Sequence, residues 1–186
     1  MVGEWHERKW KILFMKSGPT YFRKWLTDDY KSVGDISIVQ LDTWYNGLRE
    51  LPRATKDFYL VPYVSNCTGF GNNPGENSYL QRQRVKLTIV PQDRCEHEWG
   101  SLARNDSKIC TINKSGGECP GDSGTILVCD DPEDPGEYKL VGMSALGPNY
   151  CGTDVISGLF TNVLTYESWI DSVIHGHSKS SKRSRN

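Results

Sequence analysis

A glycine-rich stretch around Ser123 carries the residue types that acyl transfer requires. It reads Gly-Gly-Glu-Cys-Pro-Gly-Asp-Ser-Gly over residues 116–124 and continues into an apolar segment that ends at Cys129. Glycines at this density let backbone N–H groups turn toward one point, where they can hold an oxyanion. A serine among such donors is placed to attack a carbonyl carbon. Because Gly, Asp and Ser also dominate ordinary turns, the surrounding sequence must decide between the two interpretations.

Length and composition indicate a domain of strands joined by turns. The 186 residues are enough to bury a core, and 18 glycines and 9 prolines favour turns over long helices. The net charge of −1 gives no reason to expect a nucleic-acid partner. No apolar run is long enough to span a membrane. The first eight residues place acids where a secretion signal needs bases, so we expect no signal peptide in this chain.

The six cysteines argue for disulfides. They contain no Cys-x-x-Cys pair, which disfavours a zinc site, and no metal or cofactor is expected. Fifteen pairings of six cysteines are possible. Disulfides imply an oxidising compartment, and Asn66, Asn105 and Asn113 each open a glycosylation sequon, so the body of the chain has the character of a secreted protein.

Residue periodicity predicts the individual elements. We expect strands over residues 2–16, 80–91, 126–129, 139–143 and 158–163. The strands at 126–129 and 139–143 should form a hairpin around an acidic, solvated loop. A short helix should surround Cys95, and a second helix, over residues 166–174, has one apolar face. That face consists of Trp169, Ile170, Val173 and Ile174.

Several segments together resemble the chymotrypsin-like (trypsin-family) serine proteases. Cys-x-Gly-Asp-Ser-Gly at 119–124, preceded by Ile-Cys at 109–110, resembles their active-site segment. Asp-Ile-Ser-Ile-Val-Gln-Leu at 35–41 resembles the strand that the catalytic aspartate opens. Residues 63–71 resemble the start of the second barrel, with Phe70 in place of the usual Trp. The resemblance extends from about residue 2 to 174.

This resemblance implies an all-β fold of two packed antiparallel six-stranded β-barrels, the first one incomplete, with a C-terminal α-helix. The protease domain would cover residues 1–177 and divide into 1–50, a remnant of the first barrel, 51–165, the second barrel with its connection, and 166–177, the helix. Residues 178–186, basic and serine-rich, should be a disordered tail. The implied disulfides join Cys67 with Cys129, Cys95 with Cys110 and Cys119 with Cys151.

The resemblance also implies the catalytic roles. Ser123 would be the nucleophile, Asp35 the orienting acid, and the N–H groups of Gly121 and Ser123 the oxyanion hole. Asp122 would hold the loop in shape, and in active family members it pairs with a new N-terminus made by proteolysis. The partners would be protein or peptide substrates and protease inhibitors, with no nucleic acid and no membrane.

The catalytic histidine is absent from its usual place. In the family it lies in a Thr-Ala-Ala-His-Cys segment before the aspartate, and this chain has no such segment. Its four histidines, at positions 6, 97, 175 and 177, are expected on the surface. Loss of the histidine together with its local cysteine pair indicates one missing block. We therefore expect a truncated chain with almost no peptidase activity, related to a secreted full-length enzyme.

The specificity pocket departs from the family pattern. Gly117 stands where enzymes that cleave after Lys or Arg have Asp, and Glu118 could charge the pocket or point to solvent. Ser144-Ala145-Leu146 replaces the usual Ser-Trp-Gly, so Leu146 is expected to narrow the pocket opposite Gly158. These changes predict a small or unusual pocket.

Two functions remain open. The first is serine-type endopeptidase; the alternative is a non-catalytic serine protease homologue that binds or regulates other proteins. Thr125 and Ile126, where the family has Gly-Pro, and Ala145, where it has Trp, favour the alternative. Gly-x-Ser-x-Gly would be the nucleophile motif of an α/β-hydrolase, but Thr125 breaks the fifth position, and no strand–helix alternation surrounds it.

Overall fold

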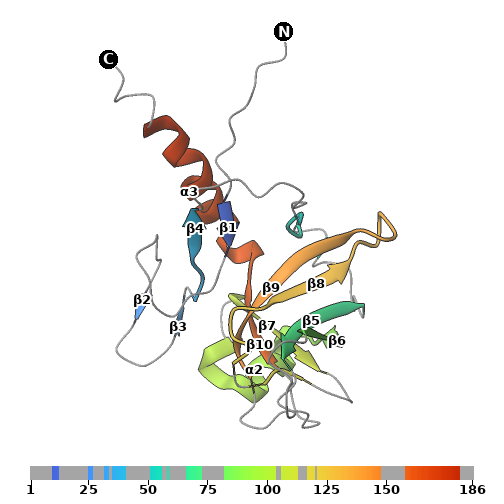
Figure 1. Ribbon diagram of the computed structural model, residues 1–186. Coiled ribbons are helices and arrows are strands. Elements are labelled where there is room, and N and C mark those ends of the chain that lie inside the picture. The colour runs from blue at the N-terminus through green and yellow to red at the C-terminus, as the bar shows by residue number, and fades with distance from the viewer. Residues whose placement is uncertain are drawn as a thin grey trace.

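The computed structural model describes the barrel, the C-terminal helix and short pieces of the N-terminal third (Figure 1). The described residues are 10–12, 25–26, 32–33, 35–40, 51–55, 58, 66–72, 82–103, 106–112, 117–119, 121–147 and 158–180. Within them no helix is long and apolar enough to cross a membrane.

Six strands between Cys67 and Asn162 close into an antiparallel barrel, as expected. They are β5 (Cys67–Asn72), β6 (Arg82–Ile89), β7 (Lys108–Ile112), β8 (Ile126–Asp130), β9 (Tyr138–Leu146) and β10 (Gly158–Asn162). Their order around the barrel is β10-β7-β6-β5-β8-β9. Closure leaves these strands without an open sheet edge. Strands β8 and β9 form the predicted hairpin, and the loop between them is mostly exposed.

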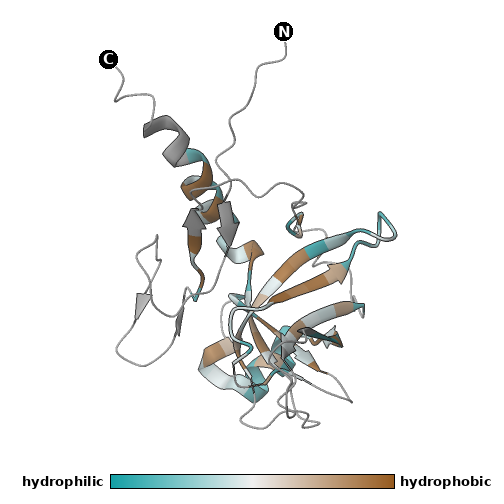
Figure 2. Cartoon of the chain, viewed as in Figure 1, coloured by the Kyte–Doolittle hydropathy of each residue, from teal (hydrophilic) through white to brown (hydrophobic). Residues whose placement is uncertain are grey.

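The barrel interior is filled by apolar side chains that alternate along the strands. Leu87, Leu127, Val141 and Phe160 lie together at the centre and are almost completely buried. Figure 2 shows the apolar residues along the barrel strands and on the part of α3 nearest the barrel. A core of this kind fixes the strand register, because a slip by one residue would turn every inward side chain toward solvent.

Two of the predicted disulfides are confirmed. Cys67 and Cys129 face each other in the β5–β8 pair, and Cys95–Cys110 joins helix α2 (Gln92–Trp99) to β7. Cys119 is also disulfide-bonded. Its predicted partner, Cys151, lies outside the described residues. The helix around Cys95 is therefore where the sequence predicts it, and it continues into a short 3-10 turn at Gly100–Ala103.

The described strands of the first fifty residues are short. Strand β1 (Trp10–Ile12) pairs antiparallel with β4 (Ile38–Gln40), and β2 (Trp25–Leu26) pairs with β3 (Ser32–Val33). The strand expected over residues 2–16 is thus described only at β1. Ile36 and Ile38 are buried in a second core cluster, which also contains Ile170 and Val173 of the C-terminal helix.

Helix α3 (Glu167–Ser180) follows a 3-10 turn at Leu164–Tyr166. The predicted apolar face is confirmed, because Ile170 and Val173 are buried and Trp169 and Ile174 pack partly buried against the same cluster. The helix continues to Ser180, so residues 178–180 are helical, although they were expected to begin the disordered tail. Residues 181–186 lie outside the described part.

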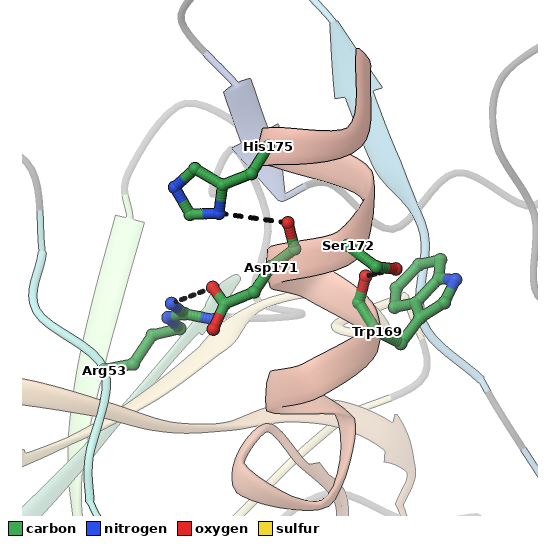
Figure 3. A network of polar contacts seen from close by, with 5 residues as sticks. All are labelled: Arg53, Trp169, Asp171, Ser172 and His175. Atoms are coloured by element: carbon green, nitrogen blue, oxygen red, sulfur yellow. Dashed lines mark hydrogen bonds and ion pairs between the residues drawn. The ribbon is translucent and has the colours of Figure 1, made fainter. Parts of the chain in front are cut away.

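The segment 51–55 connects α3 to the barrel. It runs beside β9, where Leu140 N donates to Pro52 O at 2.7 Å and Ala54 N donates to Leu140 O at 3.0 Å. The Arg53 guanidinium reaches Asp171 of α3 at 2.7 Å (Figure 3). These contacts hold the helix beside β9, the strand whose Ser144 hydrogen-bonds to the loop of Ser123.

Candidate active site

Two glycines shape the backbone around Ser123. Gly121 has φ of 104° and Gly124 has φ of 89°, a region that residues with a Cβ rarely adopt. Asp122 N donates to Cys119 O at 3.0 Å, and Thr125 N donates to Asp122 O at 3.0 Å. The two successive turns leave Ser123 exposed at the tip of the loop.

Strand β9 holds the base of this loop. Gly124 N donates to Ser144 O at 2.9 Å, and Ser144 N donates to Thr125 O at 2.9 Å. Ser144 is buried, and its position is fixed by its pairing with Phe160 of β10. The nucleophile candidate is therefore anchored to the barrel wall, which suits a residue that must keep its place during reaction.

The N–H groups of Gly121 and Ser123 flank the serine hydroxyl. Within the described residues, neither Gly121 N nor Ser123 N donates a hydrogen bond to another group. Two unpaired, exposed N–H groups on one strained loop have the form that oxyanion stabilisation needs.

Asp122 points inward, away from Ser123. The residue is 5% exposed, and its Oδ2 accepts a hydrogen bond from Cys119 N at 2.9 Å. Its carboxyl lies so close to Gly71 of β5 that a Cβ there would overlap it. A cavity of about 60 Å³ adjoins this contact and is also lined by Glu118 and Arg84. Asp122 thus holds the loop against the neighbouring strand.

Asp35 lies just before β4, against the strands that support Ser123. Its backbone carbonyl accepts a hydrogen bond from Thr161 Oγ1 at 3.1 Å. Thr161 follows Phe160 in β10, and Phe160 pairs with Ser144, the partner of the serine loop. The structure therefore brings both predicted catalytic residues to the β9–β10 pair. Burial raises the pKa of the Asp35 carboxyl, and the positive charge of Lys108 partly offsets that rise.

Glu118 is buried beside two glycines, so it does not point to solvent, and its raised pKa means that it does not supply a negative charge at neutral pH either. The residue is 6% exposed, and neither carboxyl oxygen has a hydrogen-bond partner of good geometry among the described residues. A Cβ on Gly147 would lie 2.9 Å from the Glu118 Cβ, and one on Gly158 would overlap the Glu118 carboxyl.

This environment favours the neutral form of Glu118. Burial raises the pKa of the carboxyl from 4.5 to about 8; the nearby Ser144 hydroxyl moderates the rise and the Asp122 charge adds to it. At neutral pH the group is therefore mostly a protonated carboxylic acid, which offers one O–H donor and one carbonyl acceptor.

The other expected pocket residues differ in their exposure to solvent. Gly117 precedes it and is partly exposed, while Gly158 is buried at the start of β10. Leu146 ends β9 with 39% of its surface exposed, and the side chain found against Gly158 is that of Glu118. Leu146, the residue expected to narrow the pocket opposite Gly158, is thus exposed, and Glu118 occupies the space beside that glycine.

Sequence reasoning missed Lys108. It lies in β7 with only 3% of its surface exposed, and its Nζ donates to Thr161 Oγ1 at 3.0 Å. The available signal was a lysine within Ser-Lys-Ile-Cys-Thr, beside the apolar Ile109 and Cys110.

The described histidines are remote from this chemistry. His97 is exposed on α2, and His175 is exposed on α3, where its Nδ1 contacts Asp171 O at 3.0 Å. His6 and the side chain of His177 lie outside the described part. Within that part, no group of three or more His, Cys, Asp or Glu could hold a metal ion.

Comparison with known proteins places these features in a family. The trypsin family profile matches residues 20–170. Kallikrein-8 of Homo sapiens is 31% identical over 147 residues, which cover 75% of this chain and 53% of kallikrein-8. Thrombin-like enzyme cerastocytin of Cerastes cerastes is 27% identical over 163 residues, covering 83% of this chain and 61% of that enzyme. The chain thus spans little more than half the length of these two relatives.

A solved structure shares the fold. The serine protease neuropsin, expressed in the limbic system of mouse brain, superposes with a TM-score of 0.62 at 22% identity, covering 88% of this chain and 70% of neuropsin. At that identity the match supports the architecture alone. With the profile match over most of its length, the barrel and the serine loop, the chain belongs to the trypsin family of chymotrypsin-like serine proteases.

Proposed function

We propose that the protein is built for peptide-bond hydrolysis as a serine endopeptidase, with Ser123 as nucleophile and Asp35 as the acid that orients the base. One observation carries this proposal. Ser123 is exposed on a loop bent by two positive-φ glycines, with the N–H groups of Gly121 and Ser123 both unpaired among the described residues. Donors that the fold leaves available beside an exposed hydroxyl can bind the oxygen of an attacked carbonyl.

The reaction follows from these groups. Ser123 Oγ attacks the substrate carbonyl carbon while a base removes the hydroxyl proton, and the two N–H groups stabilise the oxyanion. The protonated base then delivers that proton to the leaving amine, which departs and leaves an ester on Ser123. Water, deprotonated by the same base, hydrolyses the ester and restores the serine.

The family's usual base is a histidine in a Thr-Ala-Ala-His-Cys segment, and residues 1–186 contain no such segment. Loss of the base lowers turnover by about 10⁶ in a comparable triad. We therefore expect this polypeptide alone to turn over peptides extremely slowly. Added imidazole should restore part of the reaction, because it can take the serine proton from solution.

Labelling of Ser123 by a fluorophosphonate tests the proposal. We expect slow labelling of the 186-residue chain, faster labelling as imidazole is added, and none in Ser123→Ala. Asp35→Asn should reduce the imidazole effect, because an amide orients the ring poorly and leaves its positive charge uncompensated. If imidazole has no effect on a folded chain with intact disulfides, the catalytic proposal fails.

The pocket should accept a short, uncharged P1 side chain. Glu118 fills the space beside Gly147 and Gly158, and its mostly neutral acid at pH 7 offers no counter-charge to a basic P1 side chain. Peptidyl phosphonates that differ only at P1 test this in the presence of imidazole. Alanine or serine should label Ser123 faster than lysine or arginine, and a strict preference for a basic P1 would exclude such a pocket.

A non-catalytic homologue is the second candidate. Neither described histidine lies beside Ser123, and Ile126 and Ala145 replace residues typical of active members. Such a protein would still bind proteins of the kind that recognise the family, including protease inhibitors. Binding of an inhibitor without imidazole-dependent labelling of Ser123 would favour this candidate. In either role the disulfides suit an extracellular location.

A further inference from the structure

Lys108 is the most unusual buried residue outside the serine loop. Its side chain enters the barrel wall from β7 with 3% of its surface exposed. Burial of an ammonium is unfavourable unless hydrogen bonds and an opposite charge compensate it. The neighbours of Lys108 must therefore compensate its charge.

One neighbour is the Thr161 hydroxyl, which links Lys108 to Asp35. Thr161 Oγ1 donates its single proton to Asp35 O at 3.1 Å, so its lone pair is free to accept from Lys108 Nζ at 3.0 Å. Thr161 is completely buried. The three residues thus form a continuous hydrogen-bonded chain between β7, β10 and the residue that precedes β4.

The other neighbour is the Asp35 carboxyl. No hydrogen bond joins the Asp35 carboxyl directly to Lys108. Among the described residues, the two side chains interact through their opposite charges. Burial lowers the pKa of Lys108 and raises that of Asp35, and each charge offsets part of the other's shift. Each therefore favours the ionised form of the other.

We propose that Lys108 is a positioning residue for the catalytic aspartate: its buried ammonium, held by Thr161, is the internal counter-charge that keeps Asp35 ionised and in place against β10. The catalytic role of Asp35 rests on the function proposed above; the coupling itself does not. In a triad the imidazole is the partner of the aspartate. Here a lysine of the second barrel serves the same charge balance, so the acid stays placed whether or not an imidazole is bound.

The pKa of Asp35 in the folded chain, followed by carbon-detected NMR of its carboxyl, tests the coupling. Lys108→Met keeps a similar volume in an apolar strand and removes the charge. We expect the Asp35 pKa to rise by on the order of one unit in this variant. Lys108→Arg, which keeps the charge, should return it toward the wild-type value. Lys86→Met, at an exposed position of β6, is the matched control and should leave it unchanged.

The Asp35 pKa can be measured whether or not the protein has enzymatic activity. An unchanged Asp35 pKa in a folded Lys108→Met variant would overturn the proposal even if Ser123 reacts as expected. Conversely, failure of imidazole to promote labelling would refute the catalytic role and leave the coupling intact. If both hold, the labelling rate measured at a fixed concentration of unprotonated imidazole should begin to fall at a higher pH in Lys108→Met than in the wild type, because a protonated Asp35 does not compensate the charge of the imidazolium. A profile that does not move would show that Lys108 has no positioning role in the reaction.

Discussion

Replacement of Glu118 by glutamine removes the one buried carboxyl of the proposed pocket whose pKa is raised to about 8. The substitution keeps the size and shape of the side chain beside Gly147 and Gly158. It abolishes ionisation, so any change in the dependence of stability on pH reports the carboxyl itself. Glutamate and glutamine both bury polar atoms without partners, so the part of the free energy of unfolding that does not depend on pH should be similar in the two proteins.

The size of the effect follows from linkage. In the unfolded chain Glu118 ionises at its ordinary pKa of 4.5, whereas the folded chain retains the proton up to about pH 8. Stability from this group is therefore complete below pH 4.5 and decreases as pH rises, because only the unfolded state releases its proton. The loss is about 1.4 kcal/mol per pH unit between the two values, which amounts to about 3 kcal/mol at pH 7.

Urea unfolding at pH 5, 6, 7, 8 and 9 measures this, with the disulfides kept intact. The free energy of unfolding of the wild type should fall relative to Glu118→Gln up to about pH 8 and level off above it. Glu133→Gln, an exposed acid in the β8–β9 loop, should follow the wild type. Parallel wild-type and Glu118→Gln curves from pH 5 to 9 would refute the burial of this carboxyl in the pocket.

Two further substitutions test the supports of the site. Gly71→Ala should destabilise the fold by roughly 1 to 3 kcal/mol, because the added Cβ overlaps the Asp122 carboxyl; an unchanged urea midpoint would contradict that contact. Arg53→Met should cost about 0.5 to 1 kcal/mol, since the Arg53–Asp171 pair at 2.7 Å is partly exposed. Adding Asp171→Asn to it should cost little more in a double-mutant cycle, whereas full additivity would show that the pair does not interact.

Local pattern was sufficient for much of the barrel. The alternation in 80–91 and the acidic loop between 126–129 and 139–143 predict β6 and the β8–β9 hairpin, because strand period and turn chemistry are properties of short segments. The apolar face of 166–174 likewise predicts α3. Its extension to Ser180 was missed, since polar residues at a helix end carry no burial signal.

The long-range features were beyond such reasoning. Glu118 is buried because Gly147 and Gly158, from other segments, leave room for its side chain. The residues next to Glu118 in the sequence do not predict this burial. Lys108 is buried where Thr161, more than fifty residues away, accepts a hydrogen bond from its ammonium. In both cases the environment of a charged side chain is set by tertiary contacts, which have no local period.

The chemistry of Ser123 is tested most directly by the rate of fluorophosphonate labelling with and without imidazole. Our account predicts slow labelling of the 186-residue chain alone and a rate that rises with the concentration of unprotonated imidazole, with no labelling in Ser123→Ala. Rapid stoichiometric labelling without imidazole would show that a base is already present. No response to imidazole in the folded protein would show that Ser123 is not a catalytic nucleophile.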